Sequence, residues 1–106
     1  MKHIWRYLDP EQTIPTGGTS WGDGFCIAWQ DGNIPENGVN GAQVRDVINA
    51  VKARFEFFQD SKFACAENLE VIRLLERAVA VIDSRTARRK MAGIEGTYKT
   101  DEEGEE

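Results

Sequence analysis

The sequence is poor in the residues that build catalytic and metal sites. Among its 106 residues it has one histidine, His3, which lies in a β-prone run, and two cysteines, Cys26 and Cys65. The cysteines lack CxxC spacing, so we expect two reduced, buried thiols rather than a disulfide or a metal site. A P-loop, a Gly-rich dinucleotide fingerprint and a histidine close to a cysteine or serine are also missing. These absences argue against an enzyme, and we expect no cofactor.

Long hydrophobic runs are missing as well. No apolar stretch approaches the ~18 to 20 residues that span a bilayer. The opening residues, MKHIWRYLDP, lack the apolar core of a secretory signal. We therefore expect a cytosolic protein with no membrane partner.

An excess of basic charge is the third absence. The chain has 13 basic and 18 acidic residues, and the tail DEEGEE, residues 101–106, holds five of the acids, so the remaining body is neutral with 13 of each. Such tails are typically solvated and disordered. Long nucleic acids require an extended basic face, so a DNA-binding repressor is disfavoured, whereas a small anionic ligand is compatible with this balance.

What is present begins with two β-prone runs, KHIWRYL and FCIAWQ, separated by DPEQTIPTGGTSWGDG. The separating segment is rich in turn formers, so the pattern predicts an antiparallel β-ribbon whose two strands are joined by a long loop. The following QDGNIPENGVNG predicts successive turns. It is either a plain loop or a loop whose free backbone N–H groups face a ligand, which would make Asn33 a binding residue. Ribbon and turns together occupy residues 1–40.

Two apolar stripes at helical period predict helices over residues 42–58 and 65–91. Asn40 and Gln43 resemble a capping pair at the start of the first helix, and Gly93 ends the second. The first stripe is Val44, Val47, Ile48, Val51, Phe55 and Phe58, and the second is Leu69, Ile72, Leu75, Val79 and Ile82. About six residues join the helices, which forces an antiparallel hairpin over residues 41–92.

Three further apolar residues, Val71, Leu74 and Val81, widen the apolar face of the second helix. Either another subunit or the N-terminal ribbon covers this surplus. The predicted fold class is therefore α+β, with an N-terminal antiparallel β-ribbon packed on a long antiparallel helical hairpin, and oligomeric. Residues 1–100 form one domain, of which 93–100 are an extended arm.

Basic residues crowd the end of the second helix in DSRTARRK, residues 83–90. Arg85, Arg88, Arg89 and Lys90 either complement the helix dipole or capture a phosphate group in bidentate fashion. The next segment, GIEGTYK, brackets Thr97 with two glycines and is either a phosphate contact or a helix stop followed by the arm. The acidic side chains of the same helix are expected to form its solvated face and to pair within the helix with Arg73 or Arg77. They are Glu67, Glu70, Glu76 and Asp83.

The connector FQDSKFACAEN, residues 58–68, carries aromatic as well as polar residues. Phe58 can stack on a purine, and Asn68 offers a donor and an acceptor to a base or ribose edge. The alternative is structural, with Phe58 ending the core stripe and Asn68 lying in the first turn of the second helix. The residues alone do not decide between the two.

The order of these segments resembles the phage anti-defence nucleotide sponges, in particular the first Thoeris anti-defence family, whose hairpin is related to that of the anti-CBASS sponge. The resemblance covers residues 29–99, about two thirds of the chain, and is carried by FACAEN followed by RTARRKMAGIEGT. It implies a non-enzymatic protein of the host bacterial cytoplasm that sequesters cyclic ADP-ribose isomers made by TIR-domain immune proteins. It also implies a hexamer built from dimers, in which some members hold cyclic dinucleotides or trinucleotides in a separate pocket.

The resemblance also implies roles for individual residues. Phe58 falls where the family stacks the adenine, Asn68 falls on an asparagine of the same pocket, and Arg85 falls on an arginine that engages phosphate. The second-pocket candidates are Arg88, Arg89 and Thr97, and the segment from Gly93 to Thr97 matches a stretch of the family that is a looser candidate for ligand contact. Ala66 is a departure, because an arginine is expected at that position.

Helical geometry adds a constraint that the resemblance does not supply. Asn68 and Arg85 are 17 residues apart on one predicted helix, which corresponds to about 25 Å. One small cyclic nucleotide cannot touch both, so a shared ligand requires Arg85 of another subunit and a composite pocket. The rival hypothesis is an interaction protein whose hairpin docks a host or phage protein.

Overall fold

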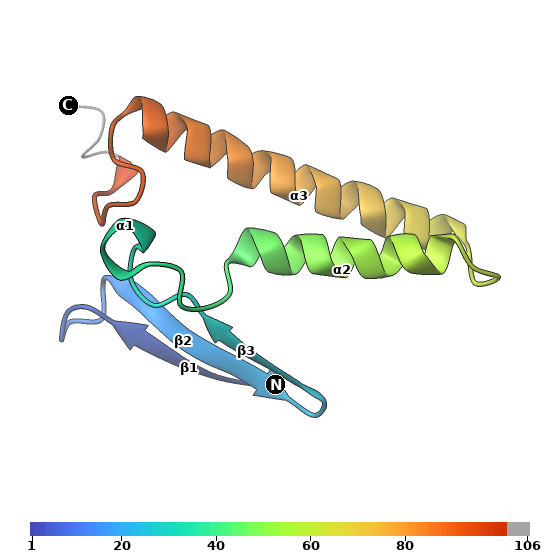
Figure 1. The fold of residues 1–106 in the computed structure, drawn as a ribbon, viewed down its shortest axis with the longest axis horizontal. Coiled ribbons are helices and arrows are strands. Elements are labelled where there is room, and N and C mark those ends of the chain that lie inside the picture. The colour runs from blue at the N-terminus through green and yellow to red at the C-terminus, as the bar shows by residue number, and fades with distance from the viewer. Residues whose placement is uncertain (102–106) are drawn as a thin grey trace. The chain divides into compact units, whose positions relative to one another are not determined.

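A computed structural model describes residues 1–101, and the acidic residues that follow, for which disorder is predicted, lie outside the described part. The chain divides into two compact units. One contains Met1–Gln43 and the segment that begins at Ala92, and the other is Val44–Met91. The first unit carries a β-sheet and the second a pair of helices, in agreement with the predicted α+β class (Figure 1).

The sheet has three antiparallel strands, β1 (Lys2–Tyr7), β2 (Pro15–Gly22) and β3 (Phe25–Trp29), with β2 in the middle (Figure 1). The prediction of two strands joined by a long loop is therefore wrong, because most of that loop is the central strand. The Asp-Gly pair between Gly22 and Phe25 closes a tight turn in which Gly24 takes a φ of 87°. Glycine adopts this left-handed conformation without steric penalty, which allows β2 and β3 to pair directly.

Gly18 explains why a glycine-rich segment serves as the central strand. It is buried and lies opposite Trp5 of β1 and Trp29 of β3. A Cβ atom at this position would come within 2.3 Å of the Ile4 carbonyl oxygen and 2.8 Å of the Trp5 ring. The missing side chain therefore permits β1 and its indole ring to approach the central strand.

The side chain of Ser20 ties the three strands together. Ser20 as a whole is 3% exposed. Its hydroxyl oxygen accepts the indole N–H of Trp29 at 2.8 Å and hydrogen-bonds to Nδ1 of His3 at 2.8 Å. The His3 ring in turn stacks on Trp5, with ring centroids 5.1 Å apart. The placement of His3 in a strand is as predicted, and the buried Ser20 hydroxyl has a partner on each neighbouring strand.

Asp9 shapes the connection between β1 and β2. Its carboxylate accepts hydrogen bonds from the backbone N–H groups of Thr13 and Ile14 and from the Thr13 hydroxyl. The hydrogen bond from the Thr13 side chain is the main cause that holds the pKa of the Asp9 carboxyl below its ordinary value.

A short helix, α1 (Ile34–Asn37), interrupts the predicted run of turns. Asn33 caps it by accepting the backbone N–H of Glu36 at 3.0 Å. Asn40 does not cap the next helix, contrary to the prediction, because its amide accepts the Asp31 N–H and donates to the Asp31 carbonyl. Helix α2 consequently begins at Val44, after the turn that these two hydrogen bonds between Asn40 and Asp31 hold.

Helices α2 (Val44–Gln59) and α3 (Ala66–Met91) run antiparallel and side by side (Figure 1), which confirms the predicted hairpin with both starts shifted by one or two residues. Its most enclosed apolar side chain is Ile72, 7% exposed. Val44 and Val51, assigned to the buried stripe, are exposed, as are the surplus residues Leu74 and Val81. The hairpin therefore buries only part of its apolar surface within its own unit.

Two ion pairs cross the hairpin. Arg45 of α2 donates from Nε and Nη2 to the two carboxylate oxygens of Asp83 of α3, at 2.7 and 3.0 Å. Nζ of Lys52 lies 4.0 Å from the Glu76 carboxylate. The predicted pairing within the second helix is thus corrected, because the helix partner lies close enough to supply the cations.

The hairpin tip is closed by side-chain hydrogen bonds. Gln59 donates to the Cys65 carbonyl and accepts the Cys65 N–H, both at 3.1 Å, so a single amide spans the turn. Cys65 and Cys26 are free thiols, but both are exposed, so their predicted burial is wrong. Cys65 lies in the tip and Cys26 on an outer strand, where neither is covered. No helix within residues 1–101 is long and apolar enough to cross a membrane.

Candidate functional site

Phe58 lies at the end of α2 within a group of aromatic side chains. Its half-buried ring is approached by Phe57 at 5.8 Å and Phe55 at 6.5 Å between centroids, both at steep angles. The guanidinium carbon of Arg54 lies over the Phe58 ring, 4.7 Å from its centroid, and 5.2 Å from the centroid of Phe57. Sequence reasoning missed Arg54 and Phe57, although their spacing of three and four residues on one helix was a usable signal.

Asn68 lies across the tip from Phe58, in the first turn of α3. Its Nδ2 donates to the Phe63 carbonyl at 3.1 Å, and the Phe63 N–H donates to Ser61, whose hydroxyl donates to the Phe58 carbonyl at 2.6 Å. This chain of hydrogen bonds connects the two predicted site residues at one end of the hairpin. The Phe63 carbonyl can only accept, so the NH2 group of the Asn68 amide must face it. The other end of the amide, Oδ1, is then available as an acceptor.

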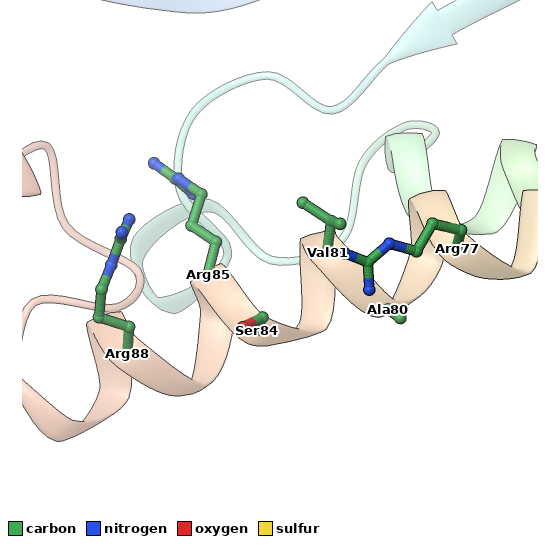
Figure 2. A pocket seen from close by; sticks show the side chains of 6 residues that line it. All are labelled: Arg77, Ala80, Val81, Ser84, Arg85 and Arg88. Atoms are coloured by element: carbon green, nitrogen blue, oxygen red, sulfur yellow. The ribbon is translucent and has the colours of Figure 1, made fainter.

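Arginines line a hollow of about 470 Å³ on α3. Figure 2 shows that the Arg85 and Arg88 side chains extend from the same side of the helix. The lining residues are Arg77, Ala80, Val81, Ser84, Arg85 and Arg88. Arg85 and Arg88 were predicted, whereas Arg77 and Ser84 were missed. Their recurrence every three to four residues with Val81 was the signal that could have found them.

The hollow lies on the side of α3 that faces away from α2. The ion pairs with α2 place Glu76 and Asp83 on the inner side of α3. At 3.6 residues per turn, Val81 and Arg85 project from roughly the opposite side of the helix. Leu74, 61% exposed, and Val81, 53% exposed, lie along this outward face. It therefore combines guanidinium groups with apolar side chains that the hairpin does not cover.

One hairpin does not bring Arg85 to the tip. Helix α3 is continuous from Ala66 to Met91 and carries both Asn68 and Arg85. Their 17-residue separation corresponds to about 25 Å along the axis, well beyond the reach of two side chains toward one small ligand.

The last turn of α3 holds two further predicted residues. Arg88 borders the hollow. Arg89 is 6% exposed and has an interaction partner. Gly93 follows the helix with a φ of 74°, which agrees with its predicted role as the helix stop.

In the sheet unit, the structure brings Asn33 together with the segment around Thr97. The Asn33 N–H donates to the hydroxyl of Tyr98 at 3.2 Å. The Thr97 hydroxyl donates to the Ile94 carbonyl at 2.5 Å and accepts the Lys99 N–H. Both predicted residues thus hold the local backbone, and their ligand roles stay predictions.

Most backbone N–H groups of residues 30–41 have acceptors, which favours a plain loop over one whose free N–H groups face a ligand, and the ligand role of Asn33 stays a prediction. The N–H groups of Gln30, Asp31, Gly32, Asn33 and Gly38 all donate to acceptors in the sheet unit. This segment is a braced turn.

The structure is thus that of a small α+β protein whose helical hairpin carries aromatic side chains at its tip and an arginine-lined outward face on α3. Residues 26–87, more than half of the chain, match the family described as Acb2/Tad1, hairpin domain. The chain belongs to this family, which confirms the resemblance drawn from the sequence.

A curated relative is named Thoeris anti-defense 1 and comes from Bacillus phage SBSphiJ7. It is 40% identical to the chain over 73 residues, which are 69% of this chain and 51% of the relative. The chain therefore spans about half the length of this relative.

Proposed function

We propose that the protein is a phage anti-immune sponge that binds cyclic ADP-ribose isomers of TIR-based defence and holds them without cleavage in the host bacterial cytoplasm. The observation that supports this most is that one hairpin carries two features. They are an aromatic platform at its tip, formed by Phe55, Phe57 and Phe58, and an arginine-lined hollow on α3. The name of the relative supports the same defence system.

The platform suits an adenine base. Phe58 supplies a stacking surface, worth about 1 to 3 kcal/mol per base in other nucleotide sites. The exocyclic amine of adenine can donate to Oδ1 of Asn68, which the bond from Nδ2 to Phe63 turns toward an external donor. A keto group at the same position would meet another acceptor, so the orientation favours adenine.

The hollow suits the diphosphate of such a ligand. Guanidinium groups bind phosphate oxygens in bidentate fashion, and Arg85 lies beside Arg77 and Arg88. Since about 25 Å of helix separates Arg85 from Asn68, the pocket is composite: the tip of one hairpin meets the outward face of another. Oligomerisation, in a hexamer built from dimers as in the family, and ligand binding are then linked.

The proposed activity is affinity without turnover. Asp83 lies on the side of α3 opposite the hollow, where its carboxylate accepts from Nε and Nη2 of Arg45, and it serves as a clamp between helices rather than as a general base. A separate pocket for cyclic dinucleotides or trinucleotides, with Arg88, Arg89 and Thr97 as its candidates, is a second prediction from the family. Gly93 and Asn33 stay predicted ligand-binding residues that are not assigned to either pocket.

Capture and release tests the proposal. The protein is incubated with cyclic ADP-ribose isomers, washed and heat-denatured, and the supernatant is analysed by chromatography and mass spectrometry. We expect intact ligand from the wild type and none from Phe58→Ala or Arg85→Ala. Arg73→Ala, which removes an arginine of α3 outside the hollow, should retain the ligand.

Two outcomes would contradict the proposal. A chemically altered ligand in the supernatant would indicate a hydrolase. A wild-type protein that retains no nucleotide would favour the rival function, in which the exposed apolar side chains of the hairpin dock a host or phage protein.

A further inference from the structure

Arg54 is the feature of the hairpin tip that the proposed function has not used. Its guanidinium carbon lies over two rings, 4.7 Å from the centroid of Phe58 and 5.2 Å from that of Phe57. Within residues 1–101 its side chain makes no ion pair or hydrogen bond, so these two rings are its partners. An exposed arginine is thus held by aromatic contacts alone.

The contact determines which side of Phe58 a ligand can use. A ring has two faces, and the guanidinium group occupies one of them. The neighbouring Phe55 and Phe57 rings meet Phe58 at interplanar angles of 76° and 62°, so neither is stacked on it. Within residues 1–101 no aromatic ring is stacked parallel on the face of Phe58 opposite Arg54, which is the face that a base would use.

Such an arrangement places the ring between a cation and a base. The attraction between the guanidinium group and the ring face holds the ring in one orientation. A base on the second face would exclude water from the ring, and cation–π interactions are stronger when desolvated. We propose that Arg54 is a positioning residue of the nucleotide site, which acts through Phe58 by holding its ring with one face open to an adenine base. This inference rests on the proposed function.

The simpler alternative is that Arg54 only decorates the surface of α2. Contacts between residues three and four apart are common on helices and contribute a few tenths of a kcal/mol to helix stability. In that case its removal would leave ligand binding unchanged. A third possibility, direct contact with the phosphates of the ligand, would make its effect independent of the Phe58 ring.

A double-mutant cycle separates these cases. Binding of cyclic ADP-ribose is measured by calorimetry for the wild type, Arg54→Met, Arg54→Lys, Phe58→Leu and the double variant Arg54→Met with Phe58→Leu. Methionine keeps an unbranched apolar chain without the charge, and leucine keeps apolar volume without the ring. Lys62→Met is the matched control, because Lys62 lies over the ring of Phe63 instead, 5.3 Å from its centroid.

We expect Arg54→Met to weaken binding about threefold to tenfold, in the range of a partly desolvated cation–π contact, and Arg54→Lys to recover part of that loss. Arg54→Met should cause no further loss when Phe58 is already leucine, and Lys62→Met should bind as the wild type does. Melting temperatures of the variants show that each is folded.

Three results would overturn the inference. Wild-type affinity in Arg54→Met would reduce the residue to a surface contact, and losses that multiply in the double variant would indicate direct contact with the ligand. A loss in Lys62→Met equal to that in Arg54→Met would reduce the effect to net charge. If the wild type itself does not bind cyclic ADP-ribose, the proposed function is wrong. That result is distinguishable from the three above, because each of them requires a wild type that binds.

Discussion

At the scale of single residues, the bond between Arg45 and Asp83 is the best-defined charged contact of the hairpin. Both carboxylate oxygens of Asp83 accept from the guanidinium group. This side-chain hydrogen bond is the main cause that lowers the pKa of Asp83 from its ordinary value of 3.8, against a smaller opposing effect of desolvation. A group whose pKa is lower in the folded state stabilises the fold above its unfolded pKa, and this stabilisation is lost as the pH falls through the folded pKa.

We therefore predict a pH-dependent effect of Asp83→Asn. At neutral pH the variant should unfold at a lower urea concentration than the wild type. The two midpoints should converge as the pH falls below 3.8 and through the lower folded pKa of Asp83, because the wild-type carboxylate is then protonated in both states. Asp60→Asn is the control, since the Asp60 carboxylate makes no ion pair within residues 1–101. A difference that persists unchanged in acid would show that the contact is not ionic.

At the scale of elements, the tip between α2 and α3 is held by few groups. The side chain of Gln59 makes two hydrogen bonds across this turn, both to the backbone of Cys65. The aromatic residues at the end of α2 adjoin the same turn. The stability of the turn and the geometry of the platform are therefore coupled.

We predict that Gln59→Ala destabilises the hairpin by about 1 to 2 kcal/mol, the net value of two hydrogen bonds in partial contact with water. Thermal unfolding followed by far-ultraviolet circular dichroism measures the change. Gln43→Ala serves as the comparison, since the Gln43 side chain makes no hydrogen bond to the described residues. Equal melting of the two variants would mean that the bonds to Cys65 do not hold the turn.

Elements also differ in how far the sequence determines them. The helices were predictable because their apolar residues repeat at helical period over many turns. Strand β2 was not, because Gly17 and Gly18 read as turn residues, and only the approach of Trp5 and the Ile4 backbone shows why glycine is required there. In the site, Phe58 and Arg85 followed from a family resemblance, whereas Arg54 was missed because a cation–π contact depends on side-chain conformation.

At the scale of the whole molecule, the proposed site is divided between copies. Ile72 and Ile94 are the buried apolar residues among those described, and large side chains such as Leu74 and Val81 remain exposed. A surface of this kind commonly marks an interface, and a ligand shared by Asn68 and Arg85 would require one.

Mixing variants tests the division directly. Phe58→Ala and Arg85→Ala should each fail to capture cyclic ADP-ribose, but an equal mixture, denatured and refolded together, should recover about a quarter of the wild-type capacity. Half of randomly paired dimers are then mixed, and each mixed dimer has one intact pocket of two. Phe58→Ala mixed with the double variant should recover nothing. Failure of the first mixture to recover would indicate a pocket within one chain.

The unbroken course of α3 sets both the distance and the direction of its arginine face relative to the tip. One added residue between Asn68 and Arg85 would lengthen the helix by only about 1.5 Å but rotate everything beyond it by about 100°. The arginine would then swing from the outward face to the flank. Seven added residues, about two turns, would nearly restore the original phase but would still move the arginine face about 10 Å farther from the tip.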